Sequence, residues 1–276
     1  FKCMTTPPLI KSISSPRLSS YKNIFGCADE ADCFPYYLWN QKLSSELYVL
    51  LSTIEICLRN RIHIVLSEEV SLKFTNAIDS NFAWYDHFSF VEVDRNGNPK
   101  RDRSGNDIFT ETGKAFRKIT HNRRGNNLNL LPQIIISKLE FGKWSYVLSA
   151  KKYNGGDLID WNKLFPLIFP CFIGMDASKH QNIIERIKVV RSWRNRLAHL
   201  EPVWKFKDIK DPVTGHVLVR APSNQTELIK RLNAEIRRAV ELLSWVCPDT
   251  HAHYKGSDSH KQLLFWASHD GIATFQ

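Results

Sequence analysis

The residues whose side chains could perform chemistry lie in the segment from Arg194 to His199. A guanidinium donates a planar pair of N–H groups to phosphate oxygens, and an imidazole can accept or release a proton near neutral pH. Asn195 follows the arginine and can orient the imidazole or bond a phosphate oxygen. These types suit proton transfer at a phosphodiester with positive charge beside it. No cluster of Asp and Glu with metal-ligand spacing lies nearby, so the pattern disfavours a two-metal mechanism.

The helix predicted over 178–199 determines where these side chains point. At about 100° per residue, Arg194 falls in the middle of an apolar stripe. An arginine that faces a core is costly unless it is paired or lines a cleft. Arg196 falls on the opposite side, where we expect it to be solvated, and Asn195 and His199 are neighbours because they are four residues apart. The stripe consists of Ile183, Ile187, Val190 and Leu197.

The spacing leaves both a catalytic and a structural interpretation open. Arg194 and His199 are about 140° apart on an ideal helix, so they do not converge automatically. Pro202 disfavours helical backbone at Glu201 and should loosen the last turn near His199, and a partner subunit could also bring the two groups together. In the structural alternative the arginine satisfies a helix end and the histidine caps carbonyl groups. Spacing alone favours that alternative, because Arg-x4-His occurs by chance in many proteins.

Hydrophobic periodicity predicts an all-α fold, a helical bundle with small β-hairpin insertions. Turn residues between short strand-like pieces predict hairpins or loops over 88–112 and 203–221. Strong helices are predicted over 37–66, 178–199 and 223–247, and weaker ones over 132–150 and 161–172. We expect an extended N-terminal arm over 1–36, one main domain over 37–248 and a C-terminal tail over 249–276.

Composition narrows the partners and the compartment. The formal net charge is +10, which favours a polyanionic partner such as nucleic acid. The six cysteines include no CxxC pair, so we expect no structural zinc site. We also expect no cofactor. No apolar run is long enough to span a membrane, and no signal peptide is evident. The sequence therefore predicts a cytoplasmic protein.

Four motifs in order resemble the Abi-like (abortive infection) family of HEPN-domain proteins. Three of them begin at Trp39-Asn40, Ile54-Glu55 and Phe141-Gly142. The fourth, from Arg194 to His199, matches the Arg-x4-6-His signature of HEPN ribonucleases. The resemblance spans roughly 37–204, and Ser145-Tyr146 departs from the more apolar stretch expected after Trp144.

The resemblance implies a HEPN-like bundle that forms a homodimer and cleaves RNA without a metal. It implies a phage-defence or toxin role, restrained by an RNA or protein antitoxin. Arg194, Asn195 and His199 would be catalytic, with Glu55, Arg59, Asn60 and Arg191 supporting them or binding RNA. For Glu55, Arg59 and His63, which are spaced by four, surface ion pairs of little energetic value are the alternative. A non-catalytic RNA-binding module and an interaction scaffold with a structural Arg194 remain the other functional interpretations.

Overall fold

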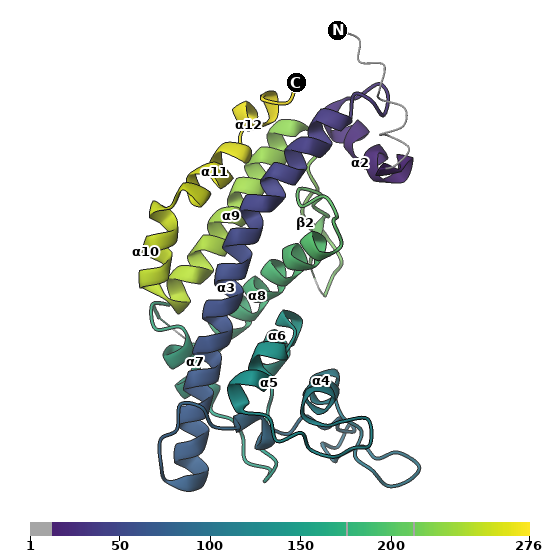
Figure 1. Cartoon of the computed structure of the whole chain (residues 1–276). Helices are drawn as coiled ribbons and strands as arrows, with labels where there is room; N and C mark the ends of the chain where they lie inside the picture. The colour runs from purple at the N-terminus through teal and green to yellow at the C-terminus, as the bar shows by residue number, and fades with distance from the viewer. Residues whose placement is uncertain (1–12, 175, 212) are drawn as a thin grey trace. The chain divides into compact units, whose positions relative to one another are not determined.

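The computed structural model describes residues 13–174, 176–211 and 213–276, and these are mostly helical (Figure 1). The predicted all-α class is therefore confirmed. The three strong helices predicted from the sequence are present, although the first is longer than the predicted range 37–66. They are α3 (Phe34–Thr75), α8 (Ala177–Ala198) and α9 (Gln225–Val246).

The chain divides into two compact units. Unit 1 comprises residues 1–53, 192–244 and 249–276, and unit 2 comprises 54–191 and 245–248. The division falls within α3, within α8 and near the end of α9, so each of these three helices contributes to both units. The three-part division expected from the sequence stays a prediction.

Unit 1 is built on the first part of α3, the end of α8 and most of α9. Two antiparallel strands, β1 (Ile209–Lys210) and β2 (Val217–Val219), form the hairpin predicted over 203–221. The described part of this unit also contains α2 (Ser15–Phe25), α10 (Pro248–Gly256, which begins in unit 2), α11 (Asp258–Trp266) and α12 (His269–Ala273).

Two of these regions correct the sequence interpretation. The N-terminal segment was expected to be extended, yet α2 lies within its described part and places Tyr21 in an aromatic cluster with Trp204, at a ring-centroid distance of 4.9 Å. Residues 1–12 of that segment lie outside the described residues. The C-terminal tail, which shows little periodicity, forms α10 to α12. A long-range hydrogen bond attaches this segment to α3: the backbone carbonyl of Trp266 accepts the indole N–H of Trp39 at 2.7 Å.

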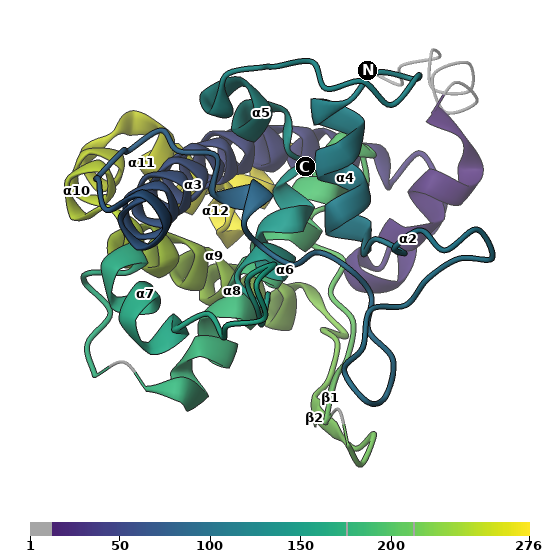
Figure 2. The same ribbon diagram turned by 90° about the horizontal axis from the view of Figure 1, so that it is seen from below.

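Unit 2 contains shorter helices and several tight turns. Where the sequence predicted one helix over 132–150, the chain forms α5 (Pro132–Lys138), a 3₁₀ turn and α6 (Trp144–Val147). The hairpin or loop predicted over 88–112 consists of turns closed by isolated bridges such as Val93 to Pro99, without regular strands. The described part of the unit also contains a 3₁₀ helix (Trp84–Asp86), α4 (Glu111–Thr120) and α7 (Trp161–Ile168). The loops around α4 project outward from it (Figure 2).

A buried histidine ties α3 to the segment that follows it. The Nδ1 atom of His63 accepts the indole N–H of Trp84 at 3.1 Å, and its Nε2 atom lies 3.1 Å from Oδ1 of Asn81. The amide nitrogen of Asn81 donates to Gln133, so Oδ1 faces the ring as an acceptor. Neutral His63 with its proton on Nε2 satisfies both Asn81 and Trp84, whereas protonation at Nδ1 would remove the bond from Trp84. Burial lowers the pKa of His63. The residue is therefore structural, and not part of a solvent-exposed line with Glu55 and Arg59.

We predict that His63 makes stability fall in acid. Because its pKa is lowered in the folded protein, the unfolded chain binds a proton first as pH falls below about 6.5. The contribution of His63 to stability is complete above that pH and is lost below it. His63→Asn should lower the free energy of unfolding at pH 7 by about 1–3 kcal/mol and flatten its dependence on pH below 6.5, measured by urea unfolding at several pH values. The same substitution at exposed His216 is the control and should leave the pH dependence of the free energy of unfolding unchanged. If His63→Asn also left it unchanged, this role of His63 would be contradicted.

Candidate functional site

The last turns of α8 divide their side chains between core and surface differently from the helical-wheel prediction. Ile183, Ile187 and Val190 are buried as expected, but the stripe continues through Trp193, which is 3% exposed. The indole N–H of Trp193 donates to the carbonyl of Val203 at 3.0 Å. Arg194, expected in the middle of the stripe, is exposed. The prediction failed because the larger apolar neighbour Trp193 takes the inward position, and Arg194, about 100° away from it on the helix, is directed toward solvent.

Arg196 was expected to be solvated, and this was also wrong. Its side chain is half-buried, and its Nη1 atom donates to the carbonyl of Pro202 at 3.1 Å and to the carbonyl of Lys205. Burial lowers the pKa of Arg196, and nearby Glu201 opposes that shift. The chain turns back after α8 and brings these carbonyl groups over the arginine, so backbone acceptors bind the half-buried guanidinium at Nη1.

Helix α8 ends in a Schellman motif. The N–H of Glu201 donates to the carbonyl of Arg196 at 2.8 Å, and that of Leu200 donates to Leu197 at 3.1 Å. His199 is the last residue before the left-handed position, which Leu200 occupies with φ 55°. The prediction that α8 ends near His199 ahead of Pro202 is therefore confirmed. The side chains of Asn195 and His199 are exposed, and no other described residue hydrogen-bonds to either.

The segment after His199 is fixed from three sides within unit 1. Asn40 on α3 is 6% exposed, and its Oδ1 atom accepts the buried N–H of Val203 at 3.1 Å. Trp193 and Arg196 bind carbonyl groups of the same segment, as described above. Arg17 on α2 donates to the carbonyl of Leu200 at 2.7 Å. These contacts hold the turn that carries His199, although the sequence had not marked Arg17 or Asn40 as site residues. A polar Asn between the apolar positions of a buried helix start was the available signal for Asn40.

The supporting residues predicted on α3 lie in unit 2. Glu55 and Arg59 are half-buried, Asn60 is exposed, and Nε of Arg59 lies 3.4 Å from Oδ1 of Asn60. Arg194, Asn195 and His199 belong to unit 1. The grouping of these two sets into one site stays a prediction.

Arg191, also predicted as a supporting residue, has defined contacts in unit 2. Its guanidinium carbon lies 5.7 Å from the ring centroid of Tyr146, and a hydrogen bond from Arg191 lowers the pKa of Tyr146. A Cβ added to Gly142 would lie 2.8 Å from Nε of Arg191, so this glycine makes room for the arginine. The departure from the family pattern at Tyr146 thus supplies the ring on which Arg191 rests.

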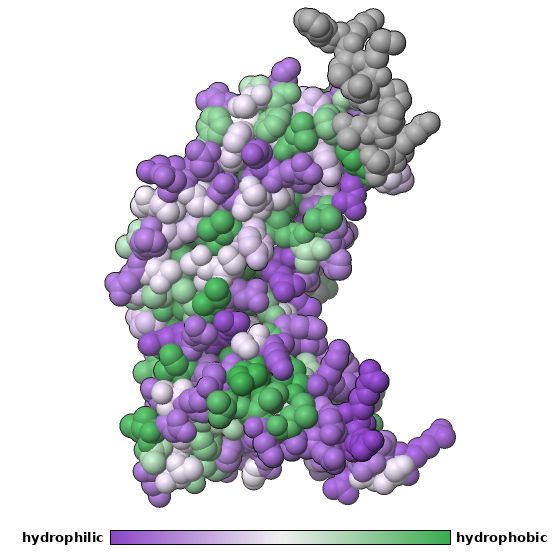
Figure 3. Space-filling model, viewed as in Figure 1, coloured by the Kyte–Doolittle hydropathy of each residue, from purple (hydrophilic) through white to green (hydrophobic). Residues whose placement is uncertain are grey.

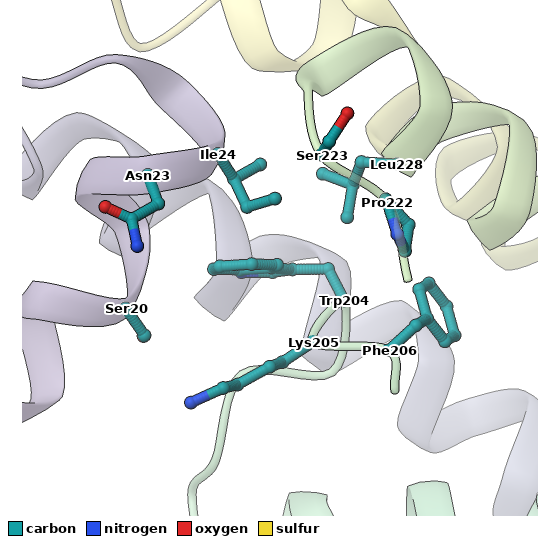
Figure 4. Close-up of a pocket in the computed structure, with 9 residues that line it drawn as sticks. All are labelled: Ser20, Asn23, Ile24, Trp204, Lys205, Phe206, Pro222, Ser223 and Leu228. Atoms are coloured by element: carbon teal, nitrogen blue, oxygen red, sulfur yellow. The ribbon is translucent and has the colours of Figure 1, made fainter. Parts of the chain in front are cut away.

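Unit 1 contains a pocket of about 460 Å³, whose lining includes residues that follow the Arg194–His199 segment in the sequence (Figure 4). In this view the indole of Trp204 lies below Ile24, and the side chains of Lys205 and Phe206 extend in opposite directions. None of the residues predicted for catalysis or RNA binding lines it. The lining consists of Ser20, Asn23, Ile24, Trp204, Lys205, Phe206, Pro222, Ser223 and Leu228.

The fold and the helix end define a mostly helical protein that presents Arg194, Asn195 and His199 at its surface. The chain belongs to the Abi-like protein family, whose model matches residues 9–205. The match includes α2, outside the resemblance noted from the motifs, and ends directly after Trp204. No curated protein and no solved structure gave a significant match. No described helix is long and apolar enough to cross a membrane.

We predict that Leu200→Gly stabilises the protein. A leucine with φ 55° has left-handed backbone, which disfavours residues with a Cβ by roughly 1 kcal/mol, and glycine is preferred after a helix end. The side chain of Leu200 is 73% exposed, so little packing is lost. The free energy of unfolding should rise by up to about 1 kcal/mol, measured by urea denaturation. Leu200→Val is the opposite control and should be destabilising. A less stable Leu200→Gly protein would show that the leucine side chain, and not its backbone strain, dominates.

Proposed function

We propose that this protein is a metal-independent endoribonuclease of the HEPN type that acts as a toxin in phage defence. One observation carries the proposal. Within the last turns of α8, Trp193 and Arg196 hold the returning chain through packing and backbone hydrogen bonds, and the side chains of Arg194, Asn195 and His199 are exposed together at the surface. Membership of the Abi-like family supports the role in abortive infection.

The chemistry follows from the substrate as much as from the protein. RNA carries its own nucleophile, the 2′-hydroxyl group, so cleavage needs a base for that proton and an acid for the leaving 5′-oxygen. His199 can serve in either role, and Arg194 can stabilise the charge on the pentavalent phosphate. Asn195 can orient the imidazole or bond a phosphate oxygen. Among the described residues no three His, Cys, Asp or Glu side chains are placed to hold a metal ion.

A homodimer would supply a second His199, so that one imidazole acts as base and the other as acid. Glu55, Arg59, Asn60 and Arg191 would position the catalytic groups or bind RNA. An RNA or protein antitoxin would restrain the activity. The alternative is a module that binds RNA without cutting it, and it shares the exposed polar helix end but predicts no new RNA ends.

We predict that the purified protein cleaves RNA in EDTA. Attack by the 2′-hydroxyl leaves a 2′,3′-cyclic phosphate or a 3′-phosphate on one fragment and a 5′-hydroxyl on the other. The ends can be identified by their reactivity toward kinase and phosphatase. His199→Ala should abolish cleavage while the circular dichroism spectrum is unchanged, because the side chain is exposed. Strict dependence on Mg²⁺ with 3′-hydroxyl products would overturn the mechanism, and RNA binding without cleavage would favour the alternative.

A second prediction separates Arg194 from Arg196. Arg194→Lys keeps the charge but loses the planar fork, so single-turnover cleavage should slow by roughly 10²-fold. RNA affinity and melting temperature should change little, because ground-state phosphate contacts are shared among many basic residues.

Arg196→Lys is the matched control on the same helix turn. The amine of a lysine ends one bond short of the position of Nη1, which weakens the bonds to the carbonyl groups of Pro202 and Lys205, so stability should fall while the folded fraction still cleaves RNA. Near-normal turnover in a well-folded Arg194→Lys protein would remove the catalytic role of Arg194.

A further inference from the structure

A five-residue sequence occurs three times in unit 2, twice before α4 and once after it. It reads Asp or Asn, then Arg, then any residue, then Gly and Asn, and it occupies 94–98, 102–106 and 122–126. All three copies are exposed. The loops that contain them project outward on either side of α4 (Figure 2).

The three copies form the same tight turn. The Oδ1 atom of the first residue accepts the N–H groups of the third and fifth residues at 2.8–3.0 Å. The first and fifth residues are also joined by a backbone hydrogen bond of 2.8–2.9 Å. The fourth residue has φ 82–83°, which explains why it is glycine. Backbone geometry thus accounts for the first and fourth positions of the repeat.

The arginine at the second position is not required by the turn. Residues 153–157 form a similar turn, with a backbone bond from the N–H of Tyr153 to Asp157 at 2.8 Å. A second bond, from the N–H of Gly156 to Tyr153 at 3.0 Å, also joins the fourth and first residues in each of the three repeats. Its second residue is Asn154, which donates to the carbonyl of Asp86. In the three repeats the second residue is Arg95, Arg103 or Arg123. Within the described chain, none of these side chains has a hydrogen bond or an ion pair.

The surface around the turns is also basic. Residues 92–126 contain nine Lys and Arg against five Asp and Glu, so they hold four of the ten net positive charges of the chain. Helix α4 buries Phe116 and exposes Lys114, Arg117 and Lys118, of which Lys114 is paired with Glu111. In Figure 3 the protruding turns, at the lower right, are hydrophilic. The acidic side chains of Asp94 and Asp102 bond to amides within their own turns.

We propose that the three turns and the exposed face of α4 form a docking surface for the phosphate backbone of RNA. Each rigid turn presents one solvated guanidinium, which can bind two phosphate oxygens without first breaking an ion pair. A set of separate cations suits a polymer with regularly repeated charges, and release of its counterions drives binding. The choice of RNA as the polyanion rests on the proposed function, whereas the surface itself does not depend on catalysis at α8.

The test measures binding separately from cleavage. Binding of a fluorescein-labelled single-stranded RNA is followed by anisotropy in EDTA, with every protein carrying His199→Ala. Arg95→Gln, Arg103→Gln and Arg123→Gln are combined in one variant. Loss of three phosphate contacts should lower the slope of log affinity against log salt by about 2 and weaken binding by roughly 10-fold or more between about 50 and 200 mM salt. Replacing the same three arginines by lysine should retain the slope, because the charge remains.

The matched control removes the same charge from exposed positions of unit 1, in the combined variant Lys42→Gln, Lys230→Gln and Arg237→Gln. Its salt slope should stay close to that of the parent. An equal loss in both triple variants would show that net charge alone drives binding and would overturn the proposal, as would unchanged binding in the turn variant. If the wild-type chain fails to cleave RNA but the turn variant still loses affinity selectively, the docking surface stands and the proposed ribonuclease does not.

Discussion

The candidate site depends on one buried hydrogen bond, from the N–H of Val203 to the side-chain amide of Asn40. Taking the N–H of Val203 out of water without a partner would cost about 1–3 kcal/mol, and Oδ1 of Asn40 supplies the partner at 3.1 Å. This bond fixes the chain just after α8 against the start of α3. With the segment in place, its carbonyl groups become acceptors for Trp193 and Arg196. The direction in which His199 leaves the helix follows from these contacts.

The end of α8 therefore both anchors the chain that follows it and presents polar side chains to solvent. The indole of Trp193 and the guanidinium of Arg196 anchor the returning chain, and their bonds leave Arg194, Asn195 and His199 on the solvent side. Leu200 takes the left-handed conformation that the sharp exit requires. Strained backbone of this kind persists where the surroundings determine it strongly, and here the Schellman bonds and Arg17 do so.

In the turns of unit 2, hydrogen bonds within five residues are enough to hold an exposed arginine in a defined turn. Asp94, Asp102 and Asn122 each hold their turn through two backbone N–H groups, and a glycine relieves the positive φ. No long-range packing is needed for this geometry, which leaves the second position free for arginine. Arg191 contrasts with these residues, because Gly142 and Tyr146 constrain its side chain.

The sequence by itself determined the helices with strong apolar periodicity, the hairpin over β1 and β2, and the end of α8 before Pro202. These features depend on near neighbours, through side-chain spacing, turn residues and the restriction that proline imposes. Tertiary structure alone decided that α2 and α10 to α12 are helical, because their patterns are weak and their stability comes from packing. It also decided which arginine faces the surface. Trp193 and Arg194 are adjacent on the helix, and a carbonyl at Val203, ten residues beyond Trp193, draws the tryptophan inward and leaves Arg194 in solvent.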